Sequence, residues 1–198
     1  MKRRILVYIL ALFVLLAGVR LGVSYFSDVA KSKGNSLSTG DFDIGISKDG
    51  KRFYDELRVF SFKDVAPGDA ETFTFYIKNR GDYPVSSLSM VLNVTDLEDG
   101  PLSKAEKAVD TTPDRGELSE YLVITDFRVE LNGNETVLTD YIGKRLRDLN
   151  MTTLRIFSGS LKPGEVLKVT MTFRLSPEAG NECLTDTSEV DMTVTATQ

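Results

Sequence analysis

The side chains of this chain that could do chemistry are mostly carboxylates, and they occur in three short clusters. The clusters are Asp41 with Asp43, Asp96 with Glu98 and Asp99, and Asp186 with Glu189 and Asp191. Calcium takes oxygen ligands, so such residues can build a calcium site. None of the clusters has the spacing of an EF-hand loop, however. We therefore expect a solvated acidic rim and neither a resident metal nor another cofactor.

The chain contains no histidine. Histidine is the commonest general base and the commonest zinc ligand in proteins. Its absence excludes a Ser-His-Asp triad, a Cys-His pair and a His-Glu-x-x-His zinc motif. We therefore expect that the protein is not an enzyme and has no catalytic residues.

Cysteine also occurs only once, as Cys183. A single cysteine cannot form an internal disulfide, so the stability of the domain must come from packing and hydrogen bonds. We expect Cys183 to be a partly buried small apolar residue. A disulfide to another molecule is the alternative.

The first 24 residues are typical of a signal peptide. Basic residues at positions 2–4 precede an apolar stretch at positions 5–19. About 15 apolar residues suit the hydrophobic region of a signal, whereas a membrane span needs about 20. Gly22 and Ser24 are small, as signal peptidase requires, and we expect cleavage between Ser24 and Tyr25. The alternative is an uncleaved anchor that tethers the domain to a membrane.

Length and charge favour one exported acidic domain. The chain has 198 residues and a net charge of −5, and the first 24 residues hold four basic and no acidic side chains. Their removal gives a net charge of −9, which disfavours binding to nucleic acid. Three Asn-x-Thr sequons, at Asn93, Asn134 and Asn150, could carry glycans in an exported chain. Asn134 is the best placed, because it follows the turn-forming pair Asn132-Gly133.

Period-2 alternation of apolar and polar residues dominates the rest of the sequence and predicts β-strands with one buried face. In residues 71–78 the inward series is Phe73, Phe75 and Ile77, and residues 166–175 alternate in the same way. Pro67-Gly68 and Pro163-Gly164 predict turns directly before these two strands. Further strands are expected at residues 42–46, 57–62, 88–94, 123–131, 154–157 and 190–195.

Helical content is expected to be small. A capping box at residues 103–106 predicts a short helix to position 109, and apolar residues at helical spacing occur in residues 140–149. Residues 96–117 are polar and read as a long excursion between strands. The pattern predicts an all-β fold, a jelly-roll β-sandwich of about eight strands with short helical insertions.

Several motifs, in this order, resemble the TasA/camelysin family of exported jelly-roll proteins. The matching segments are Tyr25-Phe26-Ser27-Asp28, Pro67-Gly68-Asp69, Asn79-Arg80-Gly81-Asp82, Pro163-Gly164-Glu165, Ala179-Gly180-Asn181-Glu182 and the last residue, Gln198. Cys183-Leu184 departs from the aromatic residue and Gln that the family often has. The resemblance implies assembly into extracellular fibres, in biofilm matrix or cell-surface threads, in which the mature N-terminus completes the sheet of the next subunit. It also implies a metallopeptidase activity, against which the absence of histidine counts.

The resemblance therefore divides the chain into a signal peptide (1–24), a donor strand and linker (25–40) and a jelly-roll domain (41–198). An unpaired sheet edge is a template for an added strand, and head-to-tail donation builds an open filament. We expect the anchors to be Val29 with Tyr25 or Phe26. The expected partners are further copies of the chain, an anchoring or accessory surface protein and signal peptidase. The alternative is a segment that pairs with its own sheet, which gives a monomeric, membrane-associated surface protein. The expected donor residues are Tyr25, Phe26, Ser27, Asp28, Val29, Ala30 and Lys31.

Overall fold

The structure is a computed structural model of the 198-residue chain. It describes residues 27–31, 43–55, 57, 60–98, 101–102, 104–110, 112, 115–183 and 186–197. For residues 27–31 it describes the backbone and its pairing. The expected signal peptide, residues 1–24, lies outside the described residues, as do Tyr25 and Phe26.

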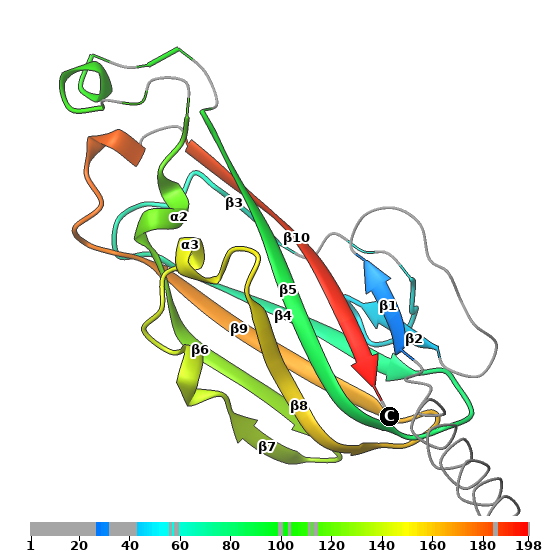
Figure 1. The fold of residues 1–198 in the computed structure, drawn as a ribbon. Helices are drawn as coiled ribbons and strands as arrows, with labels where there is room; N and C mark the ends of the chain where they lie inside the picture. Colours follow the sequence, from blue (N-terminus) through cyan, green and yellow to red (C-terminus); the bar gives the residue numbers. More distant parts are fainter. Residues whose placement is uncertain are drawn as a thin grey trace, which may run out of the picture.

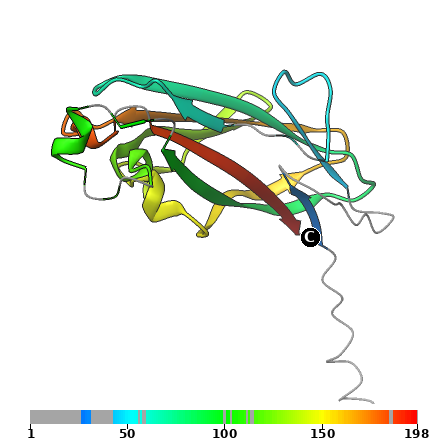
Figure 2. The ribbon, with the colours of Figure 1, turned by 90° about the horizontal axis from the view of Figure 1, so that it is seen from above.

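In the described residues, ten strands form two antiparallel sheets that pack face to face (Figures 1 and 2). One sheet has the order β1-β10-β5-β8, and β3 also pairs with β10. The other has the order β2-β4-β9-β6-β7. The strands are β1 (Ser27–Lys31), β2 (Ile44–Ser47), β3 (Phe60–Lys63), β4 (Ala70–Asn79), β5 (Val85–Glu98), β6 (Leu122–Leu131), β7 (Asn134–Val137), β8 (Thr153–Leu161), β9 (Val166–Leu175) and β10 (Asp186–Thr197).

The topology is that of a jelly roll, which confirms the expected fold class. From β3 onward, the chain changes sheets at every connection between strands except the β6–β7 hairpin. The result is two four-stranded layers, β3-β10-β5-β8 and β4-β9-β6-β7, which is the arrangement of an eight-stranded jelly roll. Two strands are additional: β2 extends the second sheet beside β4, and β1 extends the first beside β10. None of the described helices is long and apolar enough to cross a membrane.

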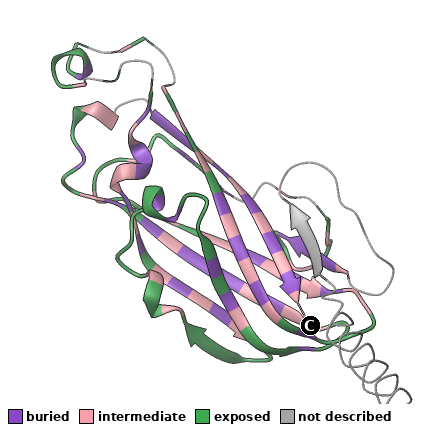
Figure 3. Ribbon diagram, in the orientation of Figure 1, coloured by how far each residue is buried: buried purple, intermediate pink, exposed green. Residues whose placement is uncertain are grey.

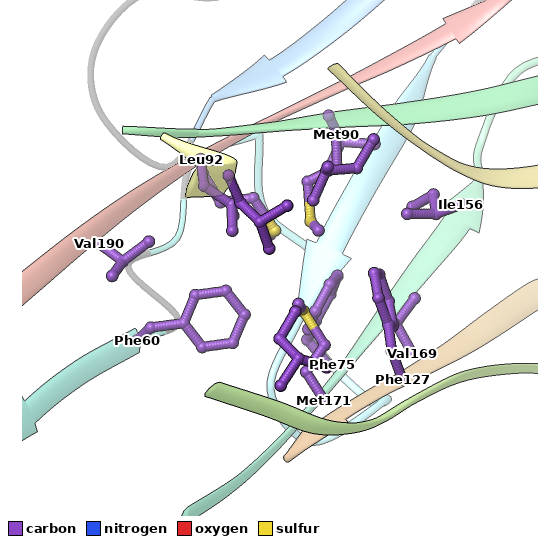
Figure 4. Packing of buried hydrophobic residues seen from close by; sticks show 14 of the residues in the cluster. Phe60, Phe75, Met90, Leu92, Phe127, Ile156, Val169, Met171 and Val190 are labelled. Atoms are coloured by element: carbon purple, nitrogen blue, oxygen red, sulfur yellow. The ribbon is translucent and has the colours of Figure 1, made fainter. Parts of the chain in front are cut away.

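Alternation along the strands builds the core, as the sequence predicted. Phe75 and Ile77 on β4 are fully buried, and Phe73 packs against the core from a partly buried position. On β9 the five apolar residues of the predicted face are all buried. Figure 3 shows the stripes of buried and half-exposed residues that this produces. In Figure 4, Met90 and Leu92 of one sheet approach Phe75 and Met171 of the other.

Phenylalanines from both sheets pack edge to face at one end of the sandwich. The ring of Phe62 on β3 lies 5.0 Å from that of Phe73 and 5.2 Å from that of Phe173 on β9, both edge to face. Phe60 lies 4.9 Å from Phe73 in the same geometry. Such pairs contribute about 0.5–1.5 kcal/mol each beyond the area they bury. This cluster holds the short strand β3 firmly against the second sheet.

The turns form where the sequence predicted them. Asn132 and Gly133 both have positive φ angles, 52° and 81°, and connect the β6–β7 hairpin. Gly68 (91°) and Gly164 (81°) take the left-handed conformation after their prolines, directly before β4 and β9. At the three glycine positions a side chain would strain the backbone.

The predicted helices are shorter than expected. Residues 140–149 do not form one helix: they contain the end of the 3₁₀ turn η2 (Thr139–Tyr141) and the single α-helical turn α3 (Leu146–Leu149). Gly143, with a φ angle of 84°, separates the two. The capping box gives only the 3₁₀ turn η1 (Glu106–Ala108), without a side-chain cap. The remaining short elements are α2 (Leu118–Tyr121) and η3 (Asn181–Cys183).

Candidate functional site

Strand β10 has one edge that is fully paired and one that is shared. Along its full length, from Asp186 to Thr197, it pairs with β5. On its other edge β3 covers residues 187–190, and β1 covers residues 193–197. One strand position of the jelly roll is therefore filled by two separate pieces of chain.

The candidate site is the part of this edge that β1 covers. The register is antiparallel, with Ser27 opposite Thr197 and Lys31 opposite Thr193. In this single chain the expected donor strand thus pairs with its own sheet, which is the alternative arrangement considered from the sequence. Five residues in an antiparallel ladder make roughly five backbone hydrogen bonds, each worth about 1 kcal/mol net.

The register places each position of β1 opposite one residue of β10. Val29 is opposite Thr195, which is half-buried, whereas Asp28 and Ala30 are opposite Ala196 and Val194, whose side chains are fully buried. Residues directly opposite in a ladder share a face of the sheet. This pairing is within one chain, so the expected anchoring of Val29 in a neighbouring subunit stays a prediction.

The core lies directly behind this edge. Met192, Val194 and Ala196 of β10 are each 0% exposed with β1 in place. Strand β1 also lies beside β2 of the other sheet, so that both edges meet at one corner of the sandwich. An uncovered β10 edge at this corner would offer backbone N–H and C=O groups next to apolar side chains.

Strand β2 is fixed at this corner by an arginine. The guanidinium of Arg80, which follows β4, donates to Asp43 Oδ1 at 2.6 Å and also to Asp55. The backbone N–H of Arg80 donates to the carbonyl of Asp43 at 2.8 Å. Burial of Arg80 opposes its charge, but Asp43 and Asp55 outweigh this, and the pKa of Arg80 is raised. Asp43 therefore already has a cation partner, while Asp41 of the same expected cluster lies outside the described residues.

Asn79, which the sequence analysis noted only as part of a motif, joins two turns. It is 1% exposed, and its Nδ2 donates to the carbonyls of Tyr83 at 2.8 Å and Leu161 at 2.9 Å. Its Oδ1 accepts from the N–H of Gly81 at 3.0 Å. Its backbone carbonyl accepts from Gly164 of the Pro-Gly turn. The Asn-x-Gly-Asp and Pro-Gly-Glu motifs therefore meet, and both are structural.

The remaining acidic residues are only in part the solvated rim that we expected, since Glu189 and Asp191 are partly exposed but others are not. Asp96 accepts hydrogen bonds from the hydroxyls of Ser119 (2.5 Å) and Ser188. Asp186 is only 3% exposed, so the interpretation as a solvated residue is wrong for it. Glu98 and Asp186 are paired across β5 and β10, and Glu106, which no expected cluster contained, joins them. Asp99 lies outside the described residues.

Burial raises the pKa of two groups near this end of the sandwich. The pKa of Asp186 is raised to about 7, mainly by burial and further by the charges of Glu98 and Glu117. The hydrogen bond from the Glu117 N–H lowers this pKa but does not outweigh the other effects. Burial, with the charges of Asp186 and Glu182, raises the pKa of Cys183 to about 12. Cys183 is half-buried and packs against the core, as expected.

The three sequon asparagines, Asn93, Asn134 and Asn150, are all exposed. Asn134 is the first residue after the β6–β7 turn. The Oδ1 of Asn150 accepts the N–H of Val94 at 2.9 Å, which leaves its amide nitrogen, the atom that carries a glycan, outside that hydrogen bond. The positions suit modification but do not select one of the three.

These features define a jelly-roll β-sandwich in which one sheet edge is completed by a separate strand from near the N-terminus. No protein-family model matches the chain, and no curated protein does. Solved structures that resemble it include a chain of the infectious bursal disease virus Gx strain, at 11% identity and a TM-score of 0.33, covering 89% of this chain and 32% of that one. Another is TmCBM61 in complex with β-1,4-galactotriose, at 13% identity and a TM-score of 0.30, covering 87% of this chain and 88% of that one. The chain spans about a third of the viral chain, and neither likeness carries an argument about what the chain does.

Proposed function

We propose that the protein is an exported, non-enzymatic structural subunit of an extracellular filament, in biofilm matrix or cell-surface threads. Subunits join head to tail when β1 of one copy replaces β1 on the β10 edge of the next. The observation that carries this proposal is the divided edge of β10. Five residues of this edge pair with β1, which is not one of the eight jelly-roll strands β3 to β10. The motifs shared with the TasA/camelysin family support the same assignment.

The chain length between β1 and the domain permits the exchange. Extended, the connection from Lys31 to Asp43 spans at most about 40 Å. Strand β5, the longest, has 14 residues and is therefore about 46 Å long. The connection thus reaches roughly one sandwich length, enough to place β1 on an adjacent copy.

Energetically, the exchanged and self-paired forms make the same β1–β10 contacts. Which form is favoured depends on two concentrations: that of the protein, and the effective concentration of β1 at the β10 edge of its own chain. The effective concentration is in the millimolar range for a short flexible link. We therefore expect the mature protein to be monomeric at micromolar concentration. Filaments should grow at high local concentration, or from an anchoring protein that offers a free β10 edge.

A cysteine pair across the β1–β10 ladder tests the proposal directly. In the variant Val29→Cys/Thr195→Cys the two cysteines are directly opposite. Residues 25–198 of this variant are incubated at high concentration under reducing conditions, oxidised, and run on a non-reducing denaturing gel. Strand exchange predicts a ladder of covalent oligomers, because each disulfide joins two copies. Self-pairing predicts a monomer alone.

The control is Val29→Cys/Thr193→Cys, which also has two added cysteines. They are not directly opposite each other in the ladder, because Thr193 is opposite Lys31. This control should give neither a ladder nor an internal bridge in high yield. Electron microscopy of the unmodified protein should show filaments about one sandwich wide, and deletion of residues 25–33 should abolish them. Monomer bands and dispersed particles at millimolar concentration would overturn the proposal.

That outcome would favour the second candidate, a monomeric surface protein held at a membrane by an uncleaved leader. The self-pairing of β1 in the single chain is the observation that favours it. N-terminal sequencing distinguishes the two, because a mature start at Tyr25 requires cleavage by signal peptidase. A metallopeptidase gains no support from the described residues.

A further inference from the structure

Three carboxylates from separate segments converge at the end of the sandwich where β10 begins. They are Glu98, the last residue of β5, Glu106 in η1, and Asp186, the first residue of β10. One oxygen from each lies within 4.8 Å of the others. Glu98 and Asp186 are direct partners in the β5–β10 ladder, where like charges are destabilising.

Two of these side chains are removed from water. Glu106 is 0% exposed and Asp186 is 3% exposed. For the buried carboxylate of Asp186, ionisation is costly unless a counter-charge or hydrogen bonds compensate for it. The sequence gives no sign of this arrangement, because the three residues are eight and eighty positions apart along the chain.

Asp186 has capacity for a ligand. Its Oδ2 accepts the backbone N–H of Glu117 at 2.6 Å. Its Oδ1 is buried and has no hydrogen-bond partner among the described residues. Gly116 packs directly against it, since a Cβ at that position would lie 3.1 Å from Oδ1 and 2.8 Å from the carbonyl oxygen of Leu97. A buried carboxylate oxygen without a partner, beside two further carboxylates, points to a cation.

We infer that Glu98, Glu106 and Asp186 form a binding site for a calcium ion. Calcium takes six to eight oxygen ligands at 2.3–2.6 Å, so oxygens on opposite sides of one ion are about 4.6–5.2 Å apart. The spacing of the three oxygens fits within that span. Water molecules would complete the coordination sphere, and two of the three charges would be neutralised.

The ion would tie η1, which lies in the excursion between β5 and α2, to the first residue of β10. None of the segments that resemble the TasA/camelysin family lies in this excursion. The assignment does not depend on strand exchange, because the cluster is at the opposite end of β10 from the residues that β1 covers.

Calorimetric titration and thermal unfolding test the site. Protein of residues 25–198, stripped with EGTA, is titrated with CaCl₂ and, separately, with MgCl₂. At calcium concentrations about 100-fold above the dissociation constant we expect the unfolding temperature to rise by about 5–10 °C. Magnesium should bind more weakly, because it demands a regular octahedron at shorter distances.

Asp186→Asn and Glu106→Gln should each weaken calcium binding at least tenfold. The matched control is Glu178→Gln, which removes one exposed carboxylate from the loop before β10 and should bind like the unmodified protein. The unmodified protein with and without calcium decides the question even if a variant does not fold. No calcium-dependent rise, or an equal rise in Asp186→Asn and the unmodified protein, would overturn the assignment. If the unmodified protein shows no response to calcium and Asp186→Asn is the more stable of the two, a proton compensates the cluster, and the assignment is likewise overturned.

Discussion

Replacement of Asn79 should destabilise the protein strongly, because its side chain makes several hydrogen bonds at once. The amide is 1% exposed and makes three hydrogen bonds to the backbone, at 2.8, 2.9 and 3.0 Å. In Asn79→Ala the carbonyl of Leu161, which is buried, loses a donor, at a cost of about 1–3 kcal/mol. The two part-buried bonds, to Tyr83 and from Gly81, add about 0.5–1 kcal/mol each. We expect a total loss of about 3 kcal/mol.

Asn79→Asp tests the hydrogen bonds separately from volume, because Asp and Asn have nearly the same size. At neutral pH the new carboxylate oxygen would face two carbonyl oxygens, so the loss should equal or exceed that of Asn79→Ala. Desolvation and these carbonyls would raise the folded-state pKa of the new aspartate above its unfolded value. The stability of this variant should therefore increase as the pH is lowered towards 4.

Urea unfolding followed by circular dichroism measures both variants. With a slope of about 2 kcal/mol per molar urea, the midpoint should fall by about 1.5 M. Asn93→Ala, at an exposed position of β5, is the matched control and should stay within about 0.5 kcal/mol of the unmodified protein. If Asn79→Asp loses less than about 1 kcal/mol at neutral pH, the argument that this amide joins the two turns is refuted.

Three further predictions follow from described contacts. Phe62→Ala, in the aromatic cluster at 0% exposure, should cost about 3–5 kcal/mol in urea unfolding, and a cost below about 1 kcal/mol would show that the cluster is not tightly packed. Hydrogen bonds from the N–H groups of Lys51 and Arg52 lower the pKa of Asp49 to about 2. The ionised Asp49 therefore stabilises the folded state above pH 4, and this contribution is lost as the pH falls towards 2. Asp49→Asn should weaken the acid dependence of the urea midpoint between pH 2 and 5, and an unchanged dependence would contradict the assignment. With a pKa of about 12, Cys183 should react with iodoacetamide at pH 8 about 1,000-fold more slowly in the folded protein than in urea, and equal rates would show that the thiol is not shielded.

Local patterns predicted the sandwich well. Strand β9 begins and ends at the residues that the alternation indicated, and the Asn132-Gly133 pair forms the hairpin turn. Both signals are local, because a period of two and a pair of positive φ angles depend on neighbouring residues alone. The helix expected at residues 140–149 does not form, although the apolar spacing fitted one. Gly143 interrupts it, and the apolar residues pack from two separate turns.

The sites depend on contacts that no local pattern encodes. Glu98 and Asp186 face each other only because the β5–β10 register brings them together, and Glu106 arrives from a segment without any strand pattern. The expected solvated rim was inferred from composition, which does not report burial. The pairing of β1 next to β3 likewise required the full topology, since nothing in residues 25–31 shows which edge they cover or that β3 covers the rest of it.

The division of the β10 edge between two strands limits where an incoming strand can stop. Phe60 is opposite Val190, and Lys31 is opposite Thr193, so only positions 191 and 192 are left between the two pieces. A strand that slid by one residue would exchange its two faces, and one that slid farther towards Phe60 would run into β3. In the proposed filament, β3 would therefore block further sliding of an incoming strand. It would fix the register of every joint between subunits and give the filament a constant repeat.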